Sequence, residues 1–202
     1  MPKTALIIVD PQKDFCPGGA LPVAGGDAVM GPLNAMQDLA ERKGWLVLIS
    51  RDWHPRRTTH FAEFGGPWPV HCVQGTRGAE FHDDLRVSRN AVIVSKAMRD
   101  DEDGYSPLCA NAYVPDGRTS VQFLEDAGVD DVLLGGLATD YCDKDGVLDA
   151  CRLPFIRRVR VLTDAVAAVD VNPGDGDRAL EEMRAAGAIL TTTAQVIAEE
   201  EA

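Results

Sequence analysis

Three residues with the chemistry of a cysteine nucleophile and its activators stand at the ends of apolar segments. Asp10 follows ALIIV, Lys96 ends a short apolar run, and Cys142 comes shortly after VLLGGL. A thiolate attacks carbonyl carbon, a nearby ammonium favours the thiolate by its charge, and a carboxylate moves the proton. Together, Asp10, Lys96 and Cys142 could therefore form an activated nucleophile.

Taken singly, each of these residues has a simpler explanation. Cys142 could be a core thiol, Asp10 an acid that caps a loop, and Lys96 a solvated charge. The shared position of all three near strand ends favours the functional interpretation over three separate coincidences.

A second set of residues offers nitrogen and oxygen ligands. Asp52 and His54 are two residues apart, so in an extended segment both side chains face the same way, and His71 follows in the same region. Such ligands suit a divalent transition metal. His60 and Glu63 lie nearby, and for each of them an exposed loop position is as acceptable as metal ligation.

The elements that must position these residues alternate between strand and helix. Apolar runs predict strands at 5–9, 45–50, 91–95, 132–134, 158–162 and 188–190, and helical spacing predicts helices at 27–43, 120–127, 177–186 and after 139. This alternation favours an α/β fold, a single doubly wound three-layer α/β/α domain over residues 1–202 with a mainly parallel central sheet. Ligands bind at the carboxyl ends of such strands, where Asp10, Asp52, Lys96 and Cys142 would meet.

The segment that leads to Cys142 carries its own local signals. Gly135 and Gly136 are expected to turn the chain sharply or to approach a ligand. Thr139 or Asp140 is expected to cap the following helix, with Cys142 in its first turn. There the helix dipole and the free N–H groups would favour a thiolate and could hold an oxyanion.

Composition excludes several kinds of partner. A formal net charge of −12 over 202 residues argues against binding to nucleic acid or to an anionic membrane surface. No stretch is long enough to span a membrane. Five cysteines, an odd number without a CxxC pair, and no secretory leader together predict reduced thiols in a cytoplasmic protein.

Five motifs spread over nearly the whole chain point to a known family. They are IIVDPQKDFCPGGALPV at 7–23, RDWHP at 51–55, GGPWPVHCVQGTRGAEFH at 65–82, GGLATDYC at 135–142 and TDAVAAVD at 163–170. In content and order they resemble the nicotinamidase/pyrazinamidase family, one of the isochorismatase-like cysteine hydrolases.

The resemblance implies roles for the residues near the nucleophile. Asp10, Lys96 and Cys142 match the catalytic triad of the family. A cis peptide bond is implied between Leu137 and Ala138, and the N–H groups of Ala138 and Cys142 would form the oxyanion hole.

The resemblance also implies a metal cofactor. Asp52, His54 and His71 match the ligands of one divalent ion, with zinc expected first and iron or manganese as alternatives. His60 and Glu63 occupy the places of a further ligand that varies among members, and His60 ranks ahead of Glu63.

The expected substrate is a flat aromatic amide. Phe15 and Trp68 match aromatic walls around a pyridine ring, and Tyr105 and Leu137 would line the same pocket. The family hydrolyses nicotinamide, and also pyrazinamide, to the acid and ammonia through a cysteine thioester, in NAD salvage, with the metal bound to the ring nitrogen. Relatives form dimers and larger assemblies, so a homo-oligomer is expected.

One residue departs from the family pattern beside the nucleophile. Residue 143 is Asp where a small apolar residue is usual, and a carboxylate there would oppose thiolate formation if it faced the site. Adjacent helical side chains diverge by about 100°, so Asp143 is expected to point elsewhere. Asp145 and Cys151 are also unusual in this helix.

Two other functions compete with this prediction. A related hydrolase could act on isochorismate or on ureido or carbamoyl amides, but such relatives generally lack the Asp-x-His…His metal set present here. A non-catalytic protein that binds a pyridine ligand is the alternative from another class, and the intact set of Asp10, Lys96 and Cys142 argues against it.

Overall fold

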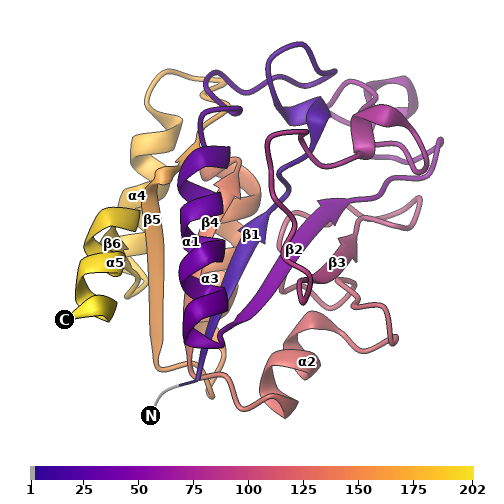
Figure 1. Cartoon of the computed structure of the whole chain (residues 1–202). Coiled ribbons are helices and arrows are strands. Elements are labelled where there is room, and N and C mark those ends of the chain that lie inside the picture. Colours follow the sequence, from indigo (N-terminus) through magenta and orange to yellow (C-terminus); the bar gives the residue numbers. More distant parts are fainter. Residues whose placement is uncertain (1–2) are drawn as a thin grey trace.

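A single parallel sheet organises the computed structural model, which describes residues 3–202 (Figure 1). Its strand order is β3-β2-β1-β4-β5-β6, and every neighbouring pair is parallel. The strands are β1 (Thr4–Val9), β2 (Leu46–Asp52), β3 (Val92–Lys96), β4 (Asp131–Leu137), β5 (Arg158–Ala167) and β6 (Ile189–Thr191). This arrangement confirms the predicted doubly wound α/β fold.

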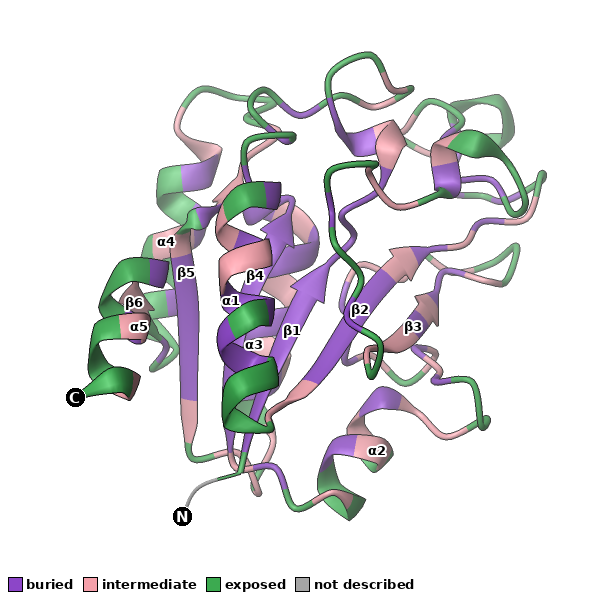
Figure 2. Ribbon diagram, in the orientation of Figure 1, coloured by how far each residue is buried: buried purple, intermediate pink, exposed green. Residues whose placement is uncertain are grey.

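Helices cover both faces of the sheet (Figure 1). On one face pack α1 (Met30–Lys43) and α5 (Thr193–Glu201), and on the other pack α2 (Ser120–Asp126), α3 (Lys144–Arg152) and α4 (Asp175–Ala185). Leu6 of β1 points to the first of these layers and Ile7 to the second. Because both faces of the strand are covered, ALIIV is apolar throughout, and Figure 2 shows the central strands as buried.

Most predicted elements agree with the structure to within a few residues, and the exceptions have physical reasons. The strand at 158–162 continues to Ala167. Helix α5 was not predicted, although Thr192 and Gln195 form a capping box that is readable in the sequence. The helix expected after Thr139 begins as a π-helical turn, η4 (Thr139–Asp143), and continues as α3.

The prediction for Gly135 and Gly136 is wrong. Strand β4 passes through both glycines without a sharp turn and ends at Leu137. Gly136 has a φ of 147°, and a Cβ there would collide with the backbone carbonyl of Val9 in β1. The glycine therefore permits the close approach of two neighbouring strands rather than the approach of a ligand.

The carboxyl edge of the sheet gathers the residues singled out in the sequence. The chain runs from β1 outward to β2 and β3, then returns to place β4 on the other side of β1. Asp10 directly follows β1, Asp52 and Lys96 end β2 and β3, and Cys142 lies in η4 after β4. The site therefore forms where the strand order reverses, as expected for this fold.

Long connections lie over this edge. The chain between β2 and β3 contains two short 3₁₀ turns, η2 (Ala62–Phe64) and η3 (Arg77–Ala79), and another, η1 (Lys13–Phe15), follows β1. Within residues 3–202, every helix is too short or too polar to cross a membrane.

At the opposite edge, Asp131 holds a buried arginine. Its Oδ2 accepts hydrogen bonds from Arg160 Nη2 at 2.6 Å and from Arg158 Nη2 at 2.9 Å. Asp131→Ala would remove the nearest carboxylate from the buried Arg160 guanidinium and leave only Glu199 and Glu200, at 3.7 and 3.9 Å. We expect the free energy of unfolding in urea to fall by about 3 kcal/mol, the low end for a broken buried ion pair. Asp130→Ala is the matched control, because its ion pair with exposed Arg157 is long, at 3.9 Å. Equal losses in both variants would contradict this role of Asp131.

Candidate active site

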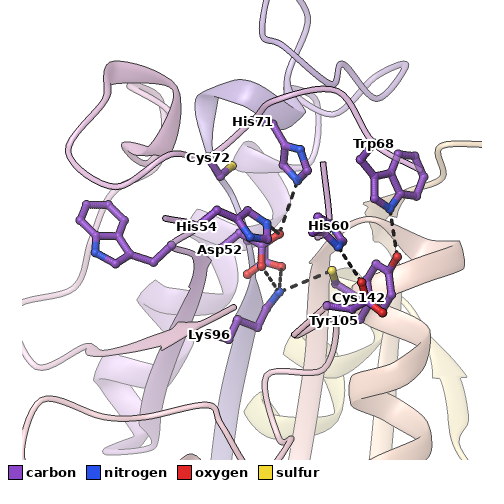
Figure 3. Close-up of polar contacts among 12 residues, drawn as sticks. Asp52, His54, His60, Trp68, His71, Cys72, Lys96, Tyr105 and Cys142 are labelled. Carbon is purple, nitrogen blue, oxygen red and sulfur yellow. Dashed lines mark hydrogen bonds and ion pairs between the residues drawn. The ribbon is translucent and has the colours of Figure 1, made fainter. Parts of the chain in front are cut away.

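The ammonium of Lys96 occupies the centre of a buried cluster (Figure 3). Its Nζ lies 2.7 Å from Asp10 Oδ2, 2.5 Å from Asp52 Oδ1 and 3.5 Å from Cys142 Sγ. All four residues are buried. The structure thus brings together the three residues predicted to act as a triad, with Asp52 beside them.

Burial and charge set the protonation of this cluster. Burial raises the pKa of Asp10 to about 6, although Lys96 opposes this shift. Burial would lower the pKa of Lys96, but the charges of Asp10 and Asp52 outweigh it and raise that pKa well above its usual value. Burial also raises the pKa of the Cys142 thiol well above its usual value. This shift favours the thiol form of Cys142, and acceptor atoms of Asp10 and Asp52 lie within 4.8 Å of its sulfur.

Two neighbours that sequence reasoning missed hold the carboxylates in place. Ser50 Oγ donates to Asp10 Oδ1 at 2.6 Å. The Gln12 side chain accepts from the N–H of Asp52 at 2.7 Å and donates to its carbonyl at 2.8 Å. Ser50 stands two residues before Asp52 on one strand, so the period of a strand could have indicated that both face the site.

The turn that carries the nucleophile differs from the predicted capped helix. The carbonyl of Ala138 accepts from the N–H groups of both Tyr141 and Asp143, at 3.0 and 3.1 Å. Neither Thr139 nor Asp140 caps the turn with its side chain. The peptide bond between Leu137 and Ala138 is cis, as the resemblance implies.

Asp140 instead anchors a neighbouring loop. Its two carboxylate oxygens accept from the N–H groups of Val169 and Asp170, each at 2.9 Å. The sequence favoured Asp140 as a local helix cap, but its carboxylate accepts its hydrogen bonds from residues about thirty positions further along the chain. The contact holds Val169 against the nucleophile turn.

Three histidines form a second cluster beside the first. One ligand atom each from His54, His60 and His71 lie within 4.8 Å of one another, and all three rings are buried. Asp52 Oδ2 faces this cluster, 3.7 Å from His54 Nε2 and 4.0 Å from His71 Nε2. Glu63 is exposed on η2 and does not belong to the cluster, so the structure brings His60 and not Glu63 to His54 and His71.

The protonation and hydrogen bonding of the histidines fit a metal ion. Both ring nitrogens of His54 are buried without a hydrogen-bond partner. Burial lowers the pKa of His71 to about 4, and its Nδ1 lies 2.8 Å from the carbonyl oxygen of Pro69, which leaves Nε2 with a free lone pair. Imidazole nitrogens beside a carboxylate oxygen of Asp52 are the donor set of a divalent transition metal.

The cluster of Asp10, Asp52 and Cys142 does not fit a metal in the same way. The ammonium of Lys96 already lies within 3.5 Å of a donor atom of each of these residues. Burial would raise the pKa of Asp52, but Lys96 and His54 outweigh burial and hold it well below the usual range. Asp52 therefore joins the two clusters as a carboxylate, with Oδ1 on the ammonium and Oδ2 toward the histidines.

A pocket of about 350 Å³ opens over the nucleophile. Five of the twelve residues that line it are the predicted aromatic, apolar and backbone positions Phe15, Trp68, Tyr105, Leu137 and Ala138; the others are Leu21, Asp52, His60, His71, Tyr141, Cys142 and Val169. Trp68 Nε1 donates to the hydroxyl of Tyr105 at 2.9 Å, which joins two walls of the pocket (Figure 3). Asp10, His54 and Lys96 lie beneath this lining rather than in it.

Leu21, Tyr141 and Val169 are pocket residues that sequence reasoning did not select. Tyr141 packs edge-on against Trp68 with ring centroids 4.9 Å apart. Its place directly before the nucleophile was a usable signal. Leu21 and Val169 are ordinary apolar residues in loops, and only the fold places them here.

Asp143 does not point toward solvent. It is fully buried, and neither of its carboxylate oxygens has a hydrogen-bond partner. Burial, and then the charges of Asp10 and Asp140, raise its pKa well above the usual value. This shift favours the neutral acid, which does not repel a thiolate, and Asp143 is absent from the pocket lining.

Comparison with known proteins places this geometry in a family. The isochorismatase domain matches residues 4–195. The chain belongs to the isochorismatase family. A nicotinamidase of Escherichia coli strain K12 is 38% identical over 213 residues, covering 96% of this chain and 97% of the relative. Members of the isochorismatase family are hydrolases, and the nicotinamidase relative acts on an amide.

Solved structures give the same picture of this isochorismatase-family chain. Pyrazinamidase of Pyrococcus horikoshii in complex with zinc has a TM-score of 0.84 and 41% identity, covering 95% of this chain and 99% of its own. PnC1 from L. infantum in complex with nicotinate has a TM-score of 0.82 and 32% identity, covering 95% and 93%.

Proposed function

We propose that this protein is a nicotinamidase, which hydrolyses nicotinamide, and also pyrazinamide, to the acid and ammonia. The observation that carries the proposal is one pocket in which Cys142 lies beside two histidines, His60 and His71, under aromatic walls. A pyridine carboxamide has a flat ring, a ring nitrogen and a reactive carbonyl, and this pocket offers a complement to each. The names of the relatives support the same substrate.

In the proposed first step, Asp10 takes the proton of the Cys142 thiol as the sulfur attacks the carboxamide carbon. A carboxyl pKa of about 6 lets Asp10 both accept and return a proton near neutral pH. The N–H groups of Ala138 and Cys142 would hold the oxyanion. When the C–N bond breaks, Asp10 returns the proton to the leaving ammonia and a thioester remains.

The second step releases the acid. Asp10 takes a proton from water as the water oxygen attacks the thioester carbon, the C–S bond breaks, and the sulfur regains a proton from Asp10. Lys96 keeps its charge throughout, because two carboxylates surround it, and it stabilises negative charge on sulfur 3.5 Å away.

We propose that Asp52, His54, His60 and His71 hold one divalent metal ion. Zinc is the first choice, and iron or manganese are alternatives for such a donor set. A bound metal would supply a Lewis acid that coordinates the pyridine nitrogen. Cys142 and Asp10 would perform the bond-making steps in every case.

The biological setting follows from the product. Nicotinate is a precursor of pyridine nucleotides, so we propose a role in NAD salvage. All five cysteines are free, which supports a reducing compartment such as the cytoplasm.

The decisive experiment measures ammonia release from nicotinamide by the purified protein before and after chelation, with metal content determined on the same sample. We expect turnover that falls on chelation and returns when zinc is added. If the metal-loaded protein releases no ammonia from nicotinamide or pyrazinamide, the proposal is wrong. Ureido, carbamoyl and isochorismate substrates would then be tried.

A further inference from the structure

We propose that Asp103 is a positioning residue for the metal site, which holds the ring of His60 so that Nε2 faces the ion. This inference rests on the metal site of the proposed function and adds a residue outside the expected ligands. Asp103 lies in the acidic loop between β3 and α2.

The contact is direct and fixes the chemistry of the ring. His60 Nδ1 lies 2.9 Å from Asp103 Oδ1. An ionised carboxylate has only acceptors, so Nδ1 must carry the hydrogen. The other nitrogen, Nε2, then keeps its lone pair for a metal. The side chain of His60 is 2% exposed, whereas that of Asp103 is 64% exposed, so the carboxylate reaches the buried ring from the surface.

The other histidines show why His60 needs this partner. The Nδ1 of His71 is fixed by the carbonyl of Pro69, two residues away in the same loop. His60 stacks on His54 with ring centroids 4.7 Å apart, and stacking alone does not distinguish the two ring orientations related by a half-turn about the Cβ–Cγ bond. The hydrogen bond to Asp103 selects one of the two orientations. Carboxylates that orient a ligating histidine typically change metal affinity by roughly 10–100-fold.

The same loop also supplies a wall of the pocket. Two residues beyond Asp103, the hydroxyl of Tyr105 accepts from Trp68, and the N–H of Thr59 donates to the carbonyl of Asp100 at 2.9 Å. These contacts do not involve the Asp103 side chain, so they should hold the loop in place when Asp103 is replaced. A loss of metal affinity would then report the lost carboxylate rather than a displaced loop.

The test compares Asp103→Ala with Asp101→Ala by titrating the metal-free proteins with zinc against a competing chelator. Asp101 is a matched control, because it lies in the same loop, is 62% exposed and pairs with Arg99 instead of a histidine. We expect the zinc dissociation constant to rise roughly 10–100-fold for Asp103→Ala. For Asp101→Ala we expect a change of less than about 3-fold, since an exposed charge is screened by salt. Asp103→Asn keeps an acceptor oxygen and should recover most of the affinity.

Cobalt provides a second readout that does not depend on turnover. The visible absorption of bound cobalt reports ligand geometry, so it should change in Asp103→Ala and stay as in the wild type in Asp101→Ala. Equal zinc affinity in the wild type and Asp103→Ala would overturn the role of Asp103 while leaving the metal site in place. If the wild type binds zinc no better than His54→Ala, the metal site itself is wrong and the role of Asp103 falls with it.

Discussion

Cys142→Ala is expected to lower kcat for nicotinamide by roughly 10⁴–10⁶-fold, the range found when one member of a hydrolase triad is removed. The substitution deletes one buried sulfur and leaves Asp10 and Lys96 in contact with each other. The other eleven residues that line the pocket are unchanged, so nicotinamide binding should survive. Ammonia release and calorimetric binding, measured on the same metal-loaded variant, would separate the two properties.

A second cysteine on the same helical segment provides the control. Cys151 lies in α3, is partly exposed and does not line the pocket. Cys151→Ala should keep nearly all of the wild-type rate. Retention of more than a small fraction of activity by Cys142→Ala would show that sulfur is not the nucleophile, whereas loss of binding would show that the sulfur is needed to hold the substrate.

Lys96→Met is expected to damage both stability and turnover. Asp10 and Asp52 are buried against the ammonium, at 2.7 and 2.5 Å, and without it two buried carboxylates would remain without a counter-charge. Removing one partner of a buried ion pair costs about 3–5 kcal/mol in the free energy of unfolding. Methionine keeps the unbranched shape of the lysine side chain and lacks only the terminal ammonium position, so the loss reports mainly the charge.

The way in which the stability of Lys96→Met depends on pH shows whether the lost charge causes the loss of stability. Without Lys96, the pKa of Asp10 in the folded state would rise further above its unfolded value, so the folded protein would bind more protons than the unfolded chain. The free energy of unfolding of the variant therefore falls as pH rises from the unfolded pKa of Asp10 to its raised folded pKa, and it recovers as pH falls. In urea unfolding of the metal-free proteins, the free energy of unfolding of Lys96→Met should lie closer to that of the wild type at about pH 5 than at about pH 8. A deficit independent of pH would contradict the electrostatic explanation.

A double variant tests the same point. Asp52→Asn added to Lys96→Met removes one of the two buried carboxylates that have lost their counter-charge, and it should recover part of the lost stability. Such coupling is expected between groups in direct contact. Simple addition of the two losses would mean that Lys96 stabilises the protein by packing alone.

The sequence was most informative where one physical rule decides the outcome. Strands covered on both faces must be apolar along their whole length, so ALIIV was readily identified as a central strand. Asp10, which directly follows it, was therefore placed at the edge of the sheet. The strand-end positions of Asp52 and Lys96 followed in the same way. Helix α5 could also have been predicted, because the sequence contains the capping-box residues Thr192 and Gln195 at its start.

Contacts between loops that lie far apart in the chain could not be predicted from the sequence. Asp103 belongs to the acidic run RDDEDG, where nothing local separates it from its neighbours, and it meets His60 from 43 residues away. Gly136 appeared as a turn because a glycine pair usually is one, but the neighbouring strand β1 sets its role. The nearest polar position beside the nucleophile, Asp143, turned inward without a partner, which no rule of helical spacing predicts.

The central place of β1 has a consequence for how the chain is made. Its partner on one side, β2, follows soon after it, but 127 residues separate Thr4 from Asp131, where the partner on the other side begins. During synthesis from the amino terminus, the most apolar strand of the sheet therefore waits with an open edge, which is a template for aggregation. Because Asp10 follows β1 and Cys142 follows β4, the site cannot assemble until these two strands pair, so activity during refolding should appear only after that edge has closed.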